Sequence, residues 1–193
     1  MAKDYAALPV NAVRRSDRAV QDEAWIEEFL NSAPMGVLAT VYDGQPFVNS
    51  NLFVYDAARH ALYTHTARVG RTRANVEGDE HVSFTATQMG RLLPADEALE
   101  FSVEYSSVVV FGRGRVIEGE DAERALQLLL DKYFPHLKPG RDYRPIMPDE
   151  LARTSVFCVD IESWSGKRKK VGEDFPGAFL YPYDRPYDKT DEA

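Results

Sequence analysis

The segment between residues 63 and 75 combines residue types that can bind a phosphate group or move a proton. Two hydroxyls and a histidine end a strand-like run, and a threonine between two arginines follows a glycine that can open a helix: Thr64, His65, Thr66, Arg71, Thr72 and Arg73. Free backbone N–H groups at a helix start, the helix dipole and guanidinium groups all favour an anion. Because one arginine can contact two phosphate oxygens, the segment predicts a phosphate site. The alternative is that the arginines only solvate the surface of a short helix.

His65 is a second candidate for chemistry in this segment. Strand alternation places Tyr63 and His65 on one face and Thr64 and Thr66 on the other. An imidazole can lie beside a planar ligand or transfer a proton near neutral pH. A histidine in a strand can also serve only as a structural hydrogen-bonding residue, so both interpretations stay open.

Three further polar groups occur at residues 49–51, 105–107 and 164–170. The first, Asn49-Ser50-Asn51, lies between apolar flanks, and buried amides need hydrogen-bond partners. These amides either bond nearby backbone or face the polar edge of a ligand. For residues 105–107, the default interpretation is that they are ordinary outward-facing residues of an amphipathic strand. Residues 164–170 form a basic corner, which is either a solvated turn or a second contact to an anionic ligand.

Several classes of function are disfavoured by what the chain contains. There is no Gly-x-Gly-x-x-Gly between a strand and a helix, no Walker loop, no Gly-x-Ser-x-Gly and no His-Glu-x-x-His. A net charge of −8 argues against a nucleic-acid partner. The single cysteine, Cys158, lies in an apolar run and is expected to be a buried strand residue, and no Cys/His cluster predicts a metal site.

The amino-terminal residues lack the long apolar region of a signal peptide. No stretch approaches the roughly 20 apolar residues that span a bilayer. We therefore expect a soluble, reduced, cytoplasmic protein with no membrane partner.

Hydrophobic periodicity predicts two main helices and strands in hairpin order. The main helices are expected from Asp22 to before Pro34 and over residues 121–133, with shorter helical segments at 70–78 and 148–152. The strands are expected at 35–42, 46–55, 61–66, 81–87, 101–118 (as one strand or two) and 154–162. Residues 90–98 are expected to form a loop. Asp43-Gly44 suits a type I′ turn between the first two strands.

Short connections and the lack of βαβ alternation favour a mainly β fold with an antiparallel sheet closed as a small barrel. We divide the chain into an amino-terminal arm at residues 1–20, one domain at 21–168 and an extended tail at 169–193.

In the same segments the chain resembles the pyridoxamine phosphate oxidase-related flavoproteins, and within them the Nim-type nitroimidazole reductases. The matching segments are 43–47, 51–55, 63–66, 70–71, 73–75, 101–108, 111–112, 153–156 and 164–167. They cover most of residues 14–168 in the family's order. The resemblance implies a six-stranded antiparallel split β-barrel that forms a homodimer, with one FMN at each end of the subunit interface.

The resemblance also implies roles for individual residues. The FMN phosphate would be held by the segment from His65 to Arg73, with Lys167 beside Trp164 as a further contact. The isoalloxazine ring would be lined by Asn49, Ser50, Asn51 and Leu52. The partner subunit would complete the pocket near Tyr105 and Ser107. His65 resembles the active-site histidine that the Nim proteins hold beside the flavin.

The implied function is an FMN-dependent oxidoreductase that takes electrons from NADH or NADPH and reduces a small planar aromatic acceptor such as a 5-nitroimidazole. The chain lacks the substrate-phosphate signature and the carboxy-terminal Arg-x-His of a true pyridoxamine phosphate oxidase, so vitamin synthesis is the weaker interpretation. The tail after Lys170 matches nothing in the family.

Two alternatives stay open at this point. One is a non-catalytic module that binds or senses a flavin with the same barrel. The other is a haem-binding member of the superfamily, for which the candidate ligands are His60, His65, His81 and His136. The apolar run at residues 108–111 is the candidate subunit interface.

Overall fold

The computed structural model describes residues 4–181 of the 193-residue chain. Its centre is one antiparallel sheet in the order β3-β2-β6-β7-β8-β5-β4, with β1 added to β8 and β9 to β6. The strands are β1 (Ala19–Val20), β2 (Gly36–Tyr42), β3 (Gln45–Asn51), β4 (Phe53–Asp56), β5 (Ala61–Ala67), β6 (His81–Leu93), β7 (Ser102–Ile117), β8 (Thr154–Lys169) and β9 (Phe179–Leu180). The helices are α1 (Glu23–Ser32), α2 (Arg71–Gly78), α3 (Gly119–Tyr133) and α4 (Pro148–Leu151), with short 3-10 turns at Tyr5–Ala7, Ser16–Arg18 and Ala98–Glu100.

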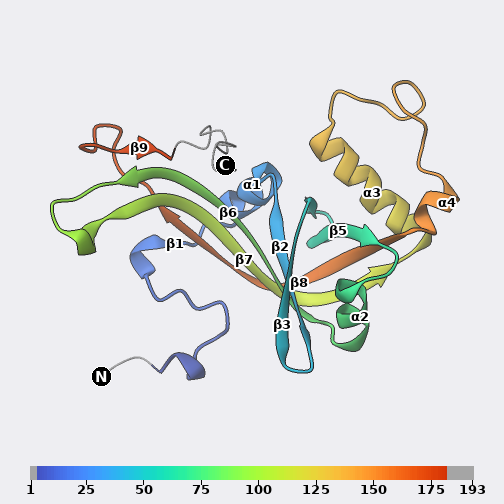
Figure 1. Ribbon diagram of the computed structural model, residues 1–193, viewed down its shortest axis with the longest axis horizontal. Helices are drawn as coiled ribbons and strands as arrows, with labels where there is room; N and C mark the ends of the chain where they lie inside the picture. The colour runs from blue at the N-terminus through green and yellow to red at the C-terminus, as the bar shows by residue number, and fades with distance from the viewer. Residues whose placement is uncertain (1–3, 182–193) are drawn as a thin grey trace, which may run out of the picture.

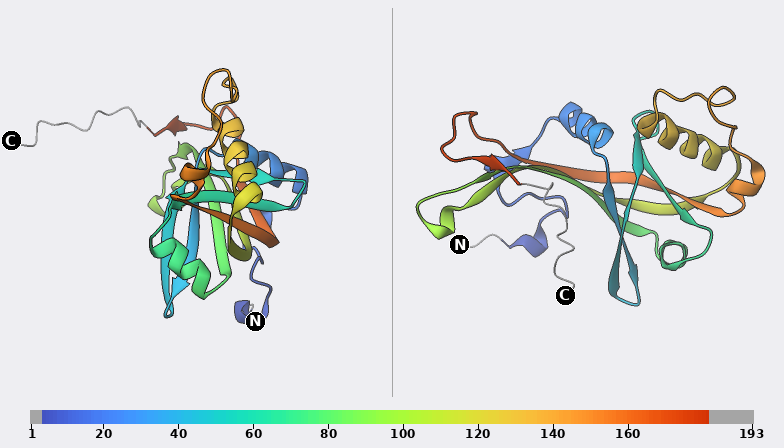
Figure 2. Two further views of the ribbon diagram at one scale, coloured as in Figure 1. Left: turned by 90° about the vertical axis from the view of Figure 1, so that its right-hand side faces the viewer. Right: turned by 45° about the horizontal axis from the view of Figure 1, so that its top comes forward.

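The three long strands β6, β7 and β8 run the length of the molecule and curve as they do so (Figure 1). Helices α1 and α3 lie above them in this view, while α2 lies below, near the β2–β3 hairpin. Seen end-on, the strands curl around a common interior with α3 against one side (Figure 2). The mainly β, antiparallel split-barrel fold is thereby confirmed.

Helix α1 begins and ends where its residues require. The Asp22 side chain accepts a hydrogen bond from the backbone N–H of Ala24 at 3.0 Å, which satisfies one of the free donors of the first turn. Its buried face, Ile26, Phe29 and Leu30, joins the main hydrophobic core. A second core forms where α3 packs against β5 and β8.

The β2–β3 hairpin turns through Asp43 (φ 48°) and Gly44 (φ 73°). Two consecutive positive φ angles are the signature of a type I′ turn, so the predicted turn is confirmed. Tyr42 and Gln45 face each other directly across it.

Several predicted strand limits are wrong. The run at residues 46–55 is two strands rather than one, because the chain breaks at Leu52 to leave β2 and pair with β5. Strand β8 continues to Lys169 instead of ending near Glu162, and β6 continues to Leu93 through the expected loop. Both strands extend because β7 offers backbone partners along most of its length, whatever the polarity of the side chains.

The sheet therefore has nine strands rather than six, although β1 and β9 contain only two residues each. Strand β7 is one continuous strand with a register shift between Phe111 and Gly112. Residues 170–181 of the predicted tail return to the sheet, where β9 pairs with Arg91 and Leu92 of β6. The remainder of that tail, residues 182–193, and residues 1–3 of the predicted arm lie outside the described residues.

Candidate functional site

The start of α2 has the features of an anion site. Gly70 precedes it with φ 156° and ψ 172°, a combination that essentially only glycine adopts. No side chain among the described residues caps this end, and a Cβ added to Gly70 would meet nothing within 4 Å. The first backbone N–H groups of α2 therefore have no side-chain cap and follow a glycine with open space beside it, which are features of anion sites at helix starts.

The two predicted phosphate-binding arginines of this turn are in different states. Arg73 is committed to protein partners, since its Nε donates to Glu77 Oε1 at 2.7 Å and its Nη1 to Ser155 Oγ at 3.1 Å. Arg71 is exposed, and its guanidinium lies 4.4 Å from the ring centroid of Tyr42. No carboxylate in residues 4–181 pairs with Arg71. Arg71 is therefore the cation available to a ligand, while Arg73 ties α2 to β8.

Asn49 and Thr72 connect the neighbouring strand to this helix. Asn49 Nδ2 donates to the Thr72 hydroxyl oxygen at 3.3 Å, and Thr72 is buried. One turn later, buried Asn75 donates from Nδ2 to Thr40 Oγ1 at 2.9 Å. These two bonds fix the position of α2 against β2 and β3, so the orientation of its first turn is set by buried contacts.

His65 lies on β5, a few residues before α2, and its burial controls its charge. Its backbone pairs with Val156, and the preceding Thr64 is anchored by a hydrogen bond from Oγ1 to the carbonyl oxygen of Leu52 at 2.9 Å. Burial lowers the pKa of His65 from its ordinary value of 6.5. The imidazole is therefore neutral at neutral pH.

Two buried polar atoms near this end of β5 have no hydrogen-bond partner among the described residues. They are Nδ1 of His65 and Nδ2 of Asn51. Asn51 ends β3 just before Phe53, which pairs with Thr64, the neighbour of His65. Buried polar groups in proteins are nearly always satisfied, so each of these two exceptions points to a missing ligand or solvent contact.

A pocket of about 360 Å³ adjoins this region, between β5 and the α3 layer. Its wall combines two predicted site residues with side chains from α3 and the following segment: Leu52, His65, Leu126, Leu129, Leu130, Tyr133, Phe134, Tyr143, Arg144, Ile146 and Glu150. Most of these are apolar or aromatic. The two charged residues, Arg144 and Glu150, pair with each other at 2.8 Å.

Four predicted site residues do not join this group within one protomer. Tyr105 pairs with Lys169, and Ser107 pairs with Lys167, far along β8 from the α2 contact at Ser155. Ser155 and Lys167 are twelve positions apart on one strand, which corresponds to roughly 40 Å of strand length. Any pocket that combines the two sets must take one of them from another copy of the chain.

Trp164, the fourth of these, belongs to a different cavity of about 570 Å³ that lies under residues 11–21. The Trp164 ring lies 4.6 Å from the His60 ring, centroid to centroid, and the Trp164 carbonyl oxygen accepts a hydrogen bond from Asn11 Nδ2 at 3.2 Å. These contacts join the amino-terminal segment to β8.

The candidate interface at residues 108–111 is only partly exposed. Val108 and Val110 are fully buried in the core of the protomer, so only the half-buried Val109 and Phe111 remain for a partner.

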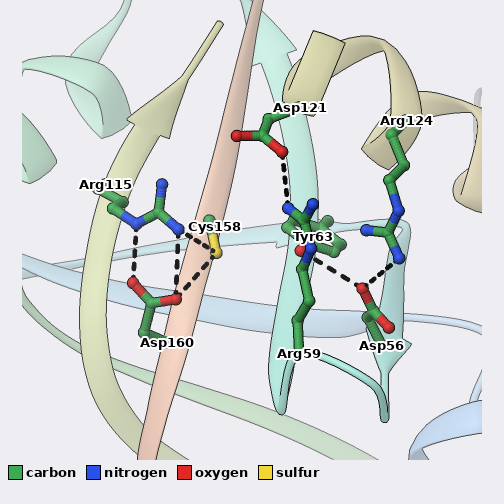
Figure 3. Close-up of polar contacts among 8 residues, drawn as sticks. All are labelled: Asp56, Arg59, Tyr63, Arg115, Asp121, Arg124, Cys158 and Asp160. Carbon is green, nitrogen blue, oxygen red and sulfur yellow. Dashed lines mark hydrogen bonds and ion pairs between the residues drawn. The ribbon is translucent and has the colours of Figure 1, made fainter.

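A polar network lies beneath the first turns of α3 (Figure 3). It comprises Asp56, Arg59, Tyr63, Arg115, Asp121, Arg124, Cys158 and Asp160. Cys158 is 1% exposed, and its thiol donates to Asp160 Oδ1 at 3.3 Å. Burial raises the pKa of this thiol to about 12, so it stays protonated at neutral pH. The prediction of a buried strand cysteine is confirmed.

Within residues 4–181, no group of three or more His, Cys, Asp or Glu side chains is placed to hold a metal ion. No helix in the same part of the chain is both long and apolar enough to cross a membrane.

Comparison with known families identifies the fold. Residues 22–168 match the sequence profile of the pyridoxamine 5'-phosphate oxidase family. The chain belongs to this family. A search of curated proteins gave no match.

Several solved structures align over most of the chain. The FAD and haem binding protein of Mycobacterium smegmatis is 24% identical in sequence and gives a TM-score of 0.70. The alignment covers 80% of this chain and 74% of that protein. The flavocytochrome Anf3 of Azotobacter vinelandii is 21% identical over 93% of this chain and 90% of its own, also with a TM-score of 0.70. A candidate 5-nitroimidazole antibiotic resistance protein of Bacteroides thetaiotaomicron is 19% identical, with a TM-score of 0.63. The alignment covers 78% of this chain and 86% of that protein. At these identities the likeness establishes the shared fold.

Sequence reasoning missed three contributors to the site of this pyridoxamine 5'-phosphate oxidase family member. Tyr42 lies under Arg71, Ser155 holds Arg73, and the α3 residues wall the pocket. The apolar stripe of α3 is visible in the sequence, but which residues of it face a cavity depends on the segment that folds back over it.

Proposed function

We propose that this chain binds FMN between two copies of itself and acts as an oxidoreductase on a small planar acceptor. The observation that carries the proposal is the uncapped start of α2, with Arg71 free of carboxylate partners, close in sequence to the unsatisfied and neutral His65.

The phosphate would be held by the first N–H groups of α2 and by the guanidinium of Arg71. One free arginine and one helix start suit a single phosphate group, which favours FMN over FAD. The buried Asn51 amide would then find its partner at the polar edge of the ring. When bound, the flavin supplies the electron transfer, while the protein fixes its orientation and surroundings.

His65 would act on the acceptor. Because its imidazole is neutral, one ring nitrogen carries a proton that can be hydrogen-bonded to an acceptor oxygen as negative charge develops there. NADH or NADPH is the proposed reductant. With a nitroaromatic acceptor, two electrons and two protons convert the nitro group to a nitroso group and one water molecule.

A homodimer is part of the proposal because the predicted residues lie in two separate sets. Tyr105, Ser107 and Lys167 would come from the partner copy, since one strand separates Lys167 from the α2 contact by roughly 40 Å. The relatives described as FAD-binding, as a flavocytochrome and as a nitroimidazole resistance protein support a flavin role for the shared fold.

The test is the visible spectrum of the purified protein, before and after incubation with FMN and desalting. Arg71→Ala should weaken FMN binding about 10- to 100-fold, the value expected for a lost charge-assisted hydrogen bond of about 1.5–3 kcal/mol. Arg141→Ala is the matched control, because Arg141 is exposed and pairs only with its neighbour Asp142. Equal FMN affinity in the two variants, or retention of FAD but not FMN, would contradict the assignment.

Turnover separates an enzyme from a binding module. His65→Ala should retain FMN and slow NADH- or NADPH-dependent reduction of nitro, quinone or aldehyde acceptors. If the flavin-loaded protein reduces none of them above background, the non-catalytic module is favoured instead.

The second candidate function is haem binding, and one of its four candidate ligands, His60, His65, His81 and His136, lies beside an apolar pocket. His65 is neutral, unsatisfied and beside an apolar pocket, which is the environment an iron ligand needs. A haemin titration checks this candidate: no shift of the Soret band, or the same shift in His65→Ala, would remove it.

A further inference from the structure

The pocket between β5 and α3 is distinct in chemistry from the anion site at α2. Its volume of about 360 Å³ lies at the lower end of the range for small-molecule sites, roughly 300–1,000 Å³. Leu126, Leu130 and Phe134 contribute apolar wall from one helix and its end, and Ile146 closes it from the following segment. A cavity of this kind suits a one- or two-ring aromatic molecule.

The charges around this pocket cancel. Arg144 is its only lining residue with a permanent positive charge, and Glu150 neutralises it at 2.8 Å. A phosphate group on a ligand would bring close to two negative charges without a free cation to meet them, and unpaired charge is costly to desolvate. The pocket therefore disfavours a phosphorylated substrate.

The wall of this pocket is held in place by hydrogen bonds of two of its tyrosines, Tyr133 and Tyr143. The Tyr133 hydroxyl lies 2.9 Å from the carbonyl oxygens of Pro34 and Phe53 and accepts from the Phe53 N–H at 3.1 Å. The segment after α3 is tied back by Gln127 Nε2, which donates to the Tyr143 hydroxyl at 2.9 Å. These contacts keep the pocket formed without a ligand.

We propose that this pocket is the acceptor site, and that it selects a neutral, apolar, unphosphorylated aromatic molecule with Leu126 and Leu130 setting its size. The inference rests on the proposed function, because His65 links the pocket to the flavin site. It separates the substrate class of this chain from the phosphorylated substrate in the family's name.

Equilibrium dialysis of the purified Arg71→Ala variant, which weakens the separate anion site at α2, tests the selection with two probes. The probes are 4-nitrobenzyl alcohol and 4-nitrobenzyl phosphate, which differ only in the charged group. We expect the alcohol to bind at least about 10-fold more tightly, since leaving one charge unpaired costs more than about 1.4 kcal/mol. Equal binding, or tighter binding of the phosphate, would overturn the inference.

Substitutions in the wall locate the probe. Leu126→Trp should fill the cavity and weaken binding of the alcohol at least about 10-fold, while Leu126→Ala should enlarge it and improve binding of the larger probe 4-nitrobiphenyl. Glu123→Trp is the control, because Glu123 is exposed on the same helix and does not line the pocket. Circular dichroism establishes that each variant is folded. Alcohol binding that is unchanged by both Leu126 variants would place the probe elsewhere and refute the inference.

The cofactor proposal and the pocket proposal fail differently. A protein that retains no flavin but still binds the alcohol, with the expected sensitivity to Leu126→Trp, refutes the cofactor assignment and supports the pocket. A flavin-loaded protein that reduces nitro compounds with no effect of the Leu126 variants on binding or KM supports the oxidoreductase and refutes the pocket.

Discussion

Removing one hydroxyl group, in Tyr133→Phe, should destabilise the protein far more than a surface substitution. This hydroxyl accepts a hydrogen bond from the Phe53 N–H and donates to one of two carbonyl oxygens, those of Pro34 and Phe53. Phe53 is fully buried, so its N–H would lose its partner. An unsatisfied buried donor costs about 1–3 kcal/mol, and the lost donated bond adds about 1 kcal/mol. We expect a total loss of about 2–4 kcal/mol.

Urea unfolding followed by circular dichroism measures this loss as a lower midpoint at an unchanged m-value. The matched control is Tyr143→Phe, which removes a single bond to the side chain of Gln127 near the surface. That change should cost about 0.5–1.5 kcal/mol, the ordinary net value of one hydrogen bond. If the two variants lose the same stability, or if Tyr133→Phe loses less than about 1 kcal/mol, the argument from the buried Phe53 N–H is wrong.

Three other predictions concern stability and reactivity. Gly112→Ala should destabilise the fold by about 1–3 kcal/mol or more in urea unfolding, because the added Cβ would overlap the backbone carbonyl oxygen of Asp160. The control Gly78→Ala should not destabilise it in this way, because the space around Gly78 is open. Cys158 should resist iodoacetamide at pH 8 in the native protein and react fully after denaturation, because burial raises the pKa of its thiol to about 12. Mass spectrometry measures the labelling, and rapid labelling of the native protein would show that the thiol is accessible. The free energy of unfolding should fall as the pH drops below 6.5, because the unfolded chain protonates His65 while burial lowers its pKa in the folded state. His65→Gln should flatten that part of the profile and exposed His136→Gln should not, so identical profiles for the wild type and His65→Gln would contradict the burial argument.

The elements that the sequence predicts well are those specified by local chemistry. Helix α1 follows from an Asp N-cap, an apolar stripe and a proline stop, and the first hairpin follows from Asp43-Gly44. Strand limits were predicted less well because hydrophobic alternation stops where a strand becomes polar, whereas pairing does not. Strand β8 continues through the basic residues up to Lys169 because β7 still offers partners there.

Within the candidate site, the residue types were predictable but their states were not. Arg71 and Arg73 are equivalent in the sequence, two positions apart on a short helix. Only the folded chain brings Glu77 and Ser155 to Arg73 and leaves Arg71 against Tyr42. The difference decides which of them can hold a ligand, and it depends on Ser155, which lies 82 positions from Arg73 in the chain.

The separation of the predicted residues into two sets has a consequence for assembly. Residues that sequence motifs group together lie at opposite ends of β8, with Ser155 at one end and Lys167 at the other. If a flavin contacts both sets of residues, two antiparallel copies of the chain are required. The dimer then has two flavin sites, one at each end of the surface that the copies share. A monomeric variant should consequently lose both sites together. Under the proposal of a flavin held between two copies, flavin binding should therefore be lost on dilution, in step with dissociation of the subunits.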